Sequence, residues 1–118
     1  MALFDTDSLV MRYENPEAGK QWWLVIFGCK QVPLPDWDNP RPFDIALQIA
    51  DKDYPTILLT DSLAPEPDRR PMLFSGNIKK AHRYLKEKGC VVGPIVSDAG
   101  PEHFDVQDVE GNVIEVCA

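Results

Sequence analysis

The chain has 118 residues, of which 44% are hydrophobic and 26% are charged, a composition typical of one globular domain that buries its own core. Its net charge of −7 argues against nucleic acid and anionic membranes as partners, because both are recognised by concentrated positive charge. The longest apolar run, Trp22–Phe27, is too short to span a bilayer. The first ten residues do not have the basic and then apolar pattern of a signal peptide, so we expect none.

The first half of the sequence predicts a strand, a helix and further strands. Apolar residues alternate over Ser8–Tyr13, as in a half-buried strand. Asn15 is a good N-cap and proline suits the next position, so a helix is expected over Pro16–Phe27, ending at Gly28. Its buried stripe is predicted to be Ala18, Trp22, Val25 and Ile26. Three more strands are expected over residues 30–32, 43–50 and 56–60, with a proline-rich loop at 33–42.

The second half repeats this order after a linker rich in proline and charge, residues 61–71. A strand is expected over Met72–Ser75, and Asn77 caps a helix expected over Ile78–Lys88. A short edge strand should follow at Pro94–Ser97, and then a hairpin over residues 103–107 and 113–117. The repetition predicts an internally duplicated α+β fold, and periodicity alone leaves a ferredoxin-like repeat open.

The remaining reactive and charged side chains have structural interpretations. The three cysteines, Cys29, Cys90 and Cys117, lack metal-type spacing and are interpreted as reduced, buried thiols of a cytoplasmic protein. A reactive thiol at Cys117 is the alternative, although nothing near it in sequence is cationic enough to favour a thiolate. His82 is interpreted as a packing residue of its helix. The basic residues beside it are interpreted as a solvated face: Lys79, Lys80, Arg83, Lys86 and Lys88.

Three segments resemble the vicinal-oxygen-chelate superfamily, which includes glyoxalase I, bleomycin-resistance proteins, fosfomycin-resistance enzymes and extradiol dioxygenases. The segment 104–116, FDVQDVEGNVIEV, is similar to the closing hairpin of that superfamily, with Val109 in place of the usual proline. The segment 12–28 is similar to its first strand and helix, with Trp22-Trp23 in place of Phe-Tyr, and 81–89 is similar to its second helix. The resemblance implies two βαβββ modules, residues about 1–62 and 69–118 of a single domain, that form a curved mixed sheet around a cleft with the helices outside.

The resemblance also implies where a metal ion would bind. Metal-dependent members use four His, Glu or Gln side chains, and the corresponding positions here hold Ser8, Leu58, Arg70 and Glu115. Leucine and arginine cannot coordinate a cation, and the charge of arginine would repel it. Asp5, Asp7 and Thr60 are the alternatives if the alignment shifts. We therefore expect no metal ion and no other cofactor.

The final hairpin supplies the candidate site. Its alternation directs Phe104, Val106, Ile114 and Val116 toward the helix and the residues between them into the cleft. His103 and Glu115 are the candidate catalytic residues, with Asp105 as a further acid or base. Arg70 either forms a salt bridge with Glu115 or binds an anionic group. The candidate ligand-binding residues are Trp37, Arg70, Phe74, Asp105 and Glu115.

These features predict a metal-independent small-molecule-binding protein of the bleomycin-resistance type. We expect it to be cytoplasmic and homodimeric, as the resemblance implies, and to bind an anionic or aromatic ligand without nucleic-acid or membrane partners. One alternative is a lyase, isomerase or dioxygenase that uses Glu115 as a base or as a metal ligand. Another is an accessory subunit without a ligand.

Overall fold

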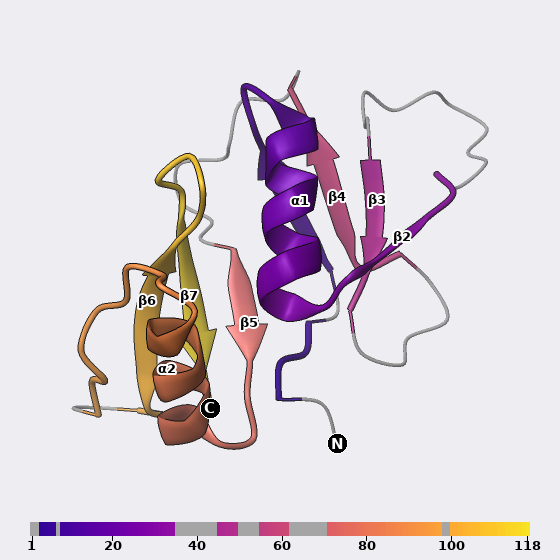
Figure 1. Ribbon diagram of the computed structural model, residues 1–118. Coiled ribbons are helices and arrows are strands. Elements are labelled where there is room, and N and C mark those ends of the chain that lie inside the picture. Colours follow the sequence, from indigo (N-terminus) through magenta and orange to yellow (C-terminus); the bar gives the residue numbers. More distant parts are fainter. Residues whose placement is uncertain (1–2, 7, 35–44, 50–54, 62–70, 98–99) are drawn as a thin grey trace.

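The computed structural model describes residues 3–6, 8–34, 45–49, 55–61, 71–97 and 100–118. The first half contains β1 (Leu9–Arg12), α1 (Pro16–Phe27), β2 (Lys30–Val32), β3 (Ile45–Gln48) and β4 (Ile57–Thr60). The second half contains β5 (Met72–Phe74), α2 (Ile78–Glu87), β6 (His103–Gln107) and β7 (Val113–Cys117). Figure 1 shows α1 lying over the first group of strands and α2 over the second.

Each half builds its own sheet, in the order β1-β4-β3-β2 and β5-β7-β6. The first strand of each half pairs in parallel with the last one, β1 with β4 and β5 with β7, and the other pairs are antiparallel. The α+β fold with two similar halves is therefore confirmed, and a ferredoxin-like arrangement, which joins both halves in one sheet, is not. The expected edge strand Pro94–Ser97 is reduced to an isolated bridge between Val96 and His103.

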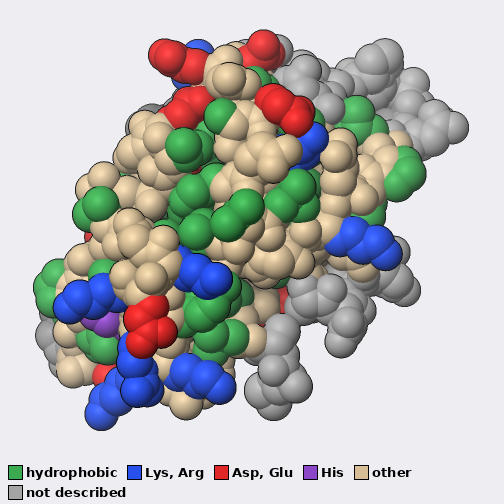
Figure 2. All heavy atoms as spheres, in the orientation of Figure 1, with side chains coloured by type: hydrophobic (Ala, Val, Ile, Leu, Met, Phe, Trp, Pro, Cys, Tyr) green, Lys and Arg blue, Asp and Glu red, His purple; other side chains and the backbone are tan. Residues whose placement is uncertain are grey.

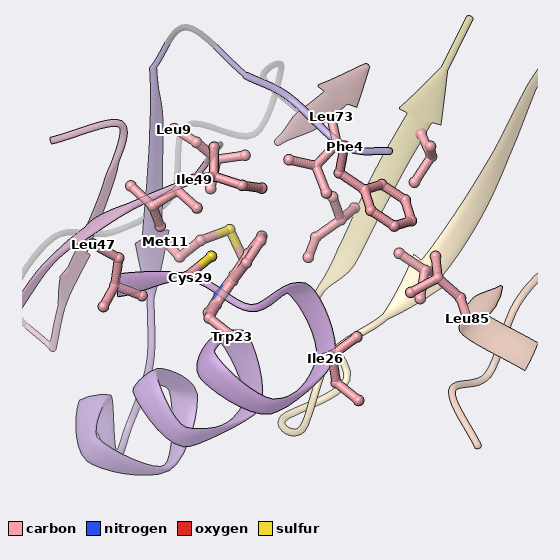
Figure 3. Packing of buried hydrophobic residues seen from close by; sticks show 14 of the residues in the cluster. Phe4, Leu9, Met11, Trp23, Ile26, Cys29, Leu47, Ile49, Leu73 and Leu85 are labelled. Atoms are coloured by element: carbon pink, nitrogen blue, oxygen red, sulfur yellow. The ribbon is translucent and has the colours of Figure 1, made fainter. Parts of the chain in front are cut away.

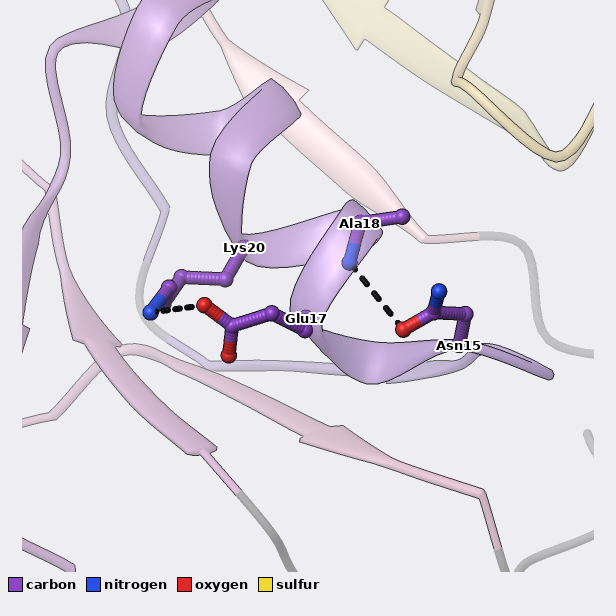
Figure 4. A network of polar contacts seen from close by, with 4 residues as sticks. All are labelled: Asn15, Glu17, Ala18 and Lys20. Carbon is purple, nitrogen blue, oxygen red and sulfur yellow. Dashed lines mark hydrogen bonds and ion pairs between the residues drawn. The ribbon is translucent and has the colours of Figure 1, made fainter.

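The helix boundaries follow from their capping residues. Asn15 Oδ1 accepts a hydrogen bond from the Ala18 amide at 3.4 Å, and an ion pair between Glu17 and Lys20 lies in the first turns of α1 (Figure 4). Gly28 ends α1 with a φ of 65°, a left-handed conformation that favours glycine. Asn77 caps α2 in the same way as Asn15 caps α1, through the Lys80 amide at 3.1 Å. The predicted bounds hold for α1, and α2 ends one residue earlier than expected.

The buried face of α1 differs from the prediction. Gly19, Trp23 and Ile26 are the buried residues, so that Ile26 is buried as predicted, whereas Val25 is 66% exposed. A Cβ atom on Gly19 would lie 2.6 Å from the ring of Tyr13, so the helix makes its closest approach to the sheet at this glycine. Residues 19, 23 and 26 follow one another at helical spacing, and this contact therefore rotates the buried stripe by one residue from the predicted one.

One hydrophobic core joins the two halves. Figure 3 shows Trp23 and Ile26 of α1 packing in the same cluster as Leu73 of β5 and Leu85 of α2. Phe4, from the segment before β1, packs edge-on against Phe27 with ring centroids 4.8 Å apart. The same segment joins the edge of β5, because Asp5 and Phe74 exchange two backbone hydrogen bonds of 2.9 and 2.7 Å. The sequence did not predict this bridge between the halves.

The turn between β6 and β7 forms a second bridge to the first half. Both carboxylate oxygens of Glu110 accept backbone amides at the start of α1, those of Glu14 at 2.8 Å and Asn15 at 3.0 Å. Asn112 donates its side-chain amide to the Arg12 carbonyl oxygen at 3.3 Å. These bonds hold the hairpin β6–β7 against the β1–α1 junction, and they therefore fix the hairpin relative to the first sheet.

The basic side chains of α2 form an exposed face. Figure 2 looks onto the side of the molecule that carries the helices, and Lys and Arg side chains gather there over α2. The interpretation of this surface as a solvated face is consistent with the exposure of all its members: Lys79, Lys80, Arg83, Lys86 and Lys88. No helix of the described residues is long and apolar enough to cross a bilayer.

Candidate functional site

The candidate site is the face of the second sheet that turns away from α2, which we call the open face. Leu73, Phe104, Val106, Ile114 and Val116 are at most 1% exposed and point into the core. Side chains alternate along a strand, so the residues between them lie on the opposite side of the sheet. All of these are at least partly exposed: Met72, Phe74, His103, Asp105, Gln107, Val113, Glu115 and Cys117. The predicted alternation of the final hairpin is therefore confirmed.

The strand register arranges the open face in cross-strand rows. Glu115 lies between Met72 of β5 and Asp105 of β6. Cys117 lies between Phe74 and His103 in the next row. Directly opposed side chains on one face of a sheet lie within contact distance. The open face thus combines apolar side chains from β5 with polar side chains from β6 and β7.

His103 has a defined orientation within these rows. Its Nδ1 lies 3.1 Å from the carbonyl oxygen of Pro101, and its Nε2 lies 3.9 Å from Glu115 Oε1. The two side chains are 33% and 22% exposed, so both are partly shielded and both reach solvent. Sequence reasoning predicted that His103 and Glu115 share a face. It did not predict the contact of His103 with Pro101, because the acceptor is a backbone carbonyl oxygen, which every residue type carries.

Two of the candidate ligand-binding residues, Trp37 and Arg70, lie outside the described residues. The proposed pairing of Arg70 with Glu115 therefore stays a prediction. Phe74 lies on the open face as its spacing predicts, and 44% of its surface is exposed. Asp105 lies directly opposite Glu115.

The residues that the resemblance assigns to the metal positions are not a set of ligands suited to a divalent ion. Leu58 in β4 has no coordinating atom, and Ser8 is an exposed residue before β1. Glu115 is the only strong ligand among the three of these positions that the structure describes. Within the described ranges, no three His, Cys, Asp or Glu side chains are grouped so that they would hold a metal ion.

The second histidine has a packing role, as the sequence predicts. His82 Nε2 lies 2.8 Å from the Gly93 carbonyl oxygen, and its ring packs edge-on against Phe104 with centroids 4.9 Å apart. The Gly93 carbonyl oxygen therefore engages one ring nitrogen of His82, and the Phe104 ring packs against the imidazole. His82 therefore orders the segment after α2 rather than facing a ligand.

The cysteines divide into one buried and two partly exposed thiols. Burial raises the pKa of the Cys29 thiol to about 12, so this thiol stays protonated and unreactive at neutral pH. Burial also raises the pKa of Cys90. The expectation that all three are buried is correct for Cys29 only, because Cys90 and Cys117 are partly exposed. All three are free thiols in this fold.

Comparison with solved structures identifies the fold. A glyoxalase/bleomycin resistance protein from Streptomyces sp. CB03234 is 20% identical, with a TM-score of 0.68 over 97% of this chain and 100% of that chain. TnmS3, an antibiotic binding protein from the same organism, is 21% identical, with a TM-score of 0.69 over 99% of this chain and 97% of that chain. The integron cassette protein HFX_CASS4, from the mobile metagenome of the Halifax Harbour sewage outfall, is 17% identical, with a TM-score of 0.74 over 97% of both chains.

These similarities define the class of fold: the chain has the fold of glyoxalase/bleomycin resistance proteins. The resemblance predicted from the sequence is confirmed at this level. No protein-family model and no curated protein sequence matches the chain.

Proposed function

We propose that this protein is a metal-independent small-molecule-binding protein of the bleomycin-resistance type, which sequesters its ligand on the open face of the second sheet. The observation that carries the proposal is the composition of that face. Apolar Met72 and Phe74 adjoin the polar groups of His103, Asp105 and Glu115. An apolar surface with a few convergent polar groups is the usual composition of a small-molecule site.

The burial of these polar groups also favours a binding surface. Uncompensated burial of polar groups costs stability, so a core packed on both faces rarely collects several of them on one side. The polar side chains of the open face remain partly exposed, and water or a ligand can satisfy them. TnmS3, which has the same fold, is an antibiotic binding protein.

The other properties of the proposal follow from the resemblance. We propose that the protein acts in the cytoplasm as a homodimer, with Trp37 and Arg70 adding an aromatic and a cationic group to the site. Metal independence is supported by Leu58 and Ser8, because neither is a suitable ligand at the positions that the resemblance assigns to the metal ligands.

A second candidate function is favoured by the geometry of His103 and Glu115. Their 3.9 Å separation on an accessible face suits a general acid and base, as in a lyase or isomerase. In this alternative, Glu115 removes a proton from the substrate, or it serves as the remaining ligand of a metal ion in a dioxygenase. An accessory subunit without any ligand is the third candidate.

The proposal predicts that Phe74→Ala removes ligand binding without unfolding the protein. A thermal-shift screen of small aromatic compounds should find binders, because a ligand at 100 times its Kd stabilises the native state by about 2.7 kcal/mol. Phe74→Ala should abolish this shift, since the ring is the largest exposed apolar group among the described residues of the open face. Val25→Ala is the control, because Val25 is also exposed but lies on the outer side of α1.

Three results would count against the proposal. If a ligand raised the melting temperature of Phe74→Ala as much as that of the wild type, the binding site would not lie on the open face. Stoichiometric metal in protein purified without chelators, lost on Glu115→Ala, would support the dioxygenase alternative instead. A screen in which no compound shifts the melting temperature would favour the accessory subunit.

A further inference from the structure

The geometry points to a ligand class: we propose that the open face selects molecules with a hydrogen-bond donor, a hydroxyl or a protonated amine, held between His103 and Glu115. This inference rests on the proposed function and names the chemistry that the proposed function leaves open. It depends on the direction of the hydrogen bonds around His103 and on the charges of its neighbours.

The contact with Pro101 fixes the proton position on His103. A carbonyl oxygen only accepts hydrogen bonds, so Nδ1, 3.1 Å from the Pro101 oxygen, carries the proton. In a neutral imidazole the other nitrogen then has a lone pair and no proton. The Nε2 atom of His103 is therefore an acceptor, and it is directed toward Glu115.

His82 has the opposite tautomer and provides an internal reference. Its Nε2 lies 2.8 Å from the Gly93 carbonyl oxygen, so Nε2 carries the proton there. The chain has only these two histidines. A single spectrum of the protein therefore compares a donating Nε2 on His82 with an accepting Nε2 on His103.

Two acceptors face each other across the gap between His103 and Glu115. The 3.9 Å between Nε2 and Oε1 is longer than a hydrogen bond, and a lone pair and a carboxylate oxygen repel one another. A donor atom placed between them lies about 2.8 Å from each. A water molecule or an ammonium group has enough protons to donate to both acceptors, whereas a hydroxyl donates to one of them. A ligand ammonium that replaces a water there keeps both hydrogen bonds, and a ligand hydroxyl keeps one.

The charges around the gap favour a cation over an anion. Among the described residues of the open face on β5, β6 and β7, none is a lysine or an arginine. An anionic group in the gap meets the carboxylate of Glu115, whereas a protonated amine is attracted to it. This part of the site therefore favours the reverse of the anionic ligand that Arg70 led us to expect from the sequence.

The test uses three probes that share a phenyl ring and a short chain: 2-phenylethylamine, 2-phenylethanol and 3-phenylpropionate. Their dissociation constants are measured by NMR titration of the backbone amides at about pH 8. We expect the amine to bind at least about tenfold more tightly than the acid, with the alcohol between them, because one charge-assisted hydrogen bond suffices for that difference. Glu115→Gln should raise the dissociation constant of the amine about tenfold and change that of the alcohol by no more than about twofold.

The control is Glu87→Gln, which makes the same charge change on the exposed face of α2. It should leave the ratio between amine and acid unchanged. Equal or tighter binding of 3-phenylpropionate to the wild type would overturn this inference but leave the proposed function standing. If no probe perturbs the amides of β5, β6 and β7, both fail. A ¹⁵N spectrum that shows His103 protonated on Nε2 would also contradict the inference.

Discussion

Gly19→Ala is expected to lower the free energy of unfolding by about 2 kcal/mol, although alanine normally stabilises a helix by about 1 kcal/mol relative to glycine. The added Cβ would lie 2.6–2.8 Å from three ring atoms of Tyr13. That ring is fully buried, and its hydroxyl accepts a hydrogen bond from Trp23 Nε1 at 2.9 Å, so it cannot move aside freely. Overpacking of this kind costs up to about 3 kcal/mol and exceeds the gain in helix propensity.

Chemical denaturation of the variant and of a matched control measures this effect. Gln21 is exposed on the same helix, so Gln21→Ala should change the free energy of unfolding by about 0.5 kcal/mol or less. A Gly19→Ala protein as stable as the wild type would mean that α1 does not approach Tyr13 as closely as the structure shows.

Asp108→Ala is expected to destabilise the protein by about 3 kcal/mol. Asp108 is 8% exposed, and its carboxylate accepts the backbone amides of Glu110 at 2.9 Å and Asn112 at 2.8 Å. Burial, together with the nearby negative charge of Asp108, raises the pKa of the Tyr13 hydroxyl. Removing the carboxylate leaves the amides of Glu110 and Asn112 without their acceptor, and it loosens the turn that carries both residues against the first half of the chain.

Glu110→Ala is the control for Asp108→Ala. The two acids lie on the same turn and each accepts two backbone amides, but Glu110 and its partners are exposed and water can replace its carboxylate. We expect Glu110→Ala to lower the free energy of unfolding by about 1 kcal/mol or less. Equal losses from the two variants, measured by urea denaturation, would show that the burial of the Asp108 carboxylate adds nothing to the contribution of its hydrogen bonds.

The sequence predicts most of the fold because local signals define its elements. Asn15 and Asn77 mark the helix starts, and both helices begin where these caps place them. The hairpin β6–β7 has the predicted bounds because polar and apolar residues alternate along β6 and because Ile114 and Val116 continue the apolar face on β7. The edge strand Pro94–Ser97 reduces to a single bridge at Val96, which agrees with the poor sheet propensity of its proline.

The buried face of α1 could not be predicted because its determinant has no hydrophobic signal. Trp22 and Trp23 are adjacent and equally apolar, so hydropathy does not choose between them. The choice is made by Gly19, whose missing side chain lets the helix approach Tyr13, and a glycine does not contribute to an apolar stripe. Contacts between distant segments, such as Asp5 with Phe74, likewise depend on how the two halves pack.

The candidate site, like the fold, can be predicted only in part from the sequence. The period of two along β6 and β7 is enough to assign His103, Asp105 and Glu115 to one face of the sheet. The register that sets Glu115 opposite Asp105, and the Pro101 carbonyl that orients His103, arise from pairing and loop geometry. The orientation of His103 toward Glu115 is the reason why we propose a hydrogen-bond donor, and not an anion, as the ligand.

A crystal structure of the protein with the tightest-binding compound of the aromatic screen would show where the ligand binds. We expect electron density for the ligand on the open face of the second sheet, in contact with Phe74 and within hydrogen-bonding distance of Glu115. Density over the outer surface of α1 or α2, with the open face free of ligand, would contradict this expectation.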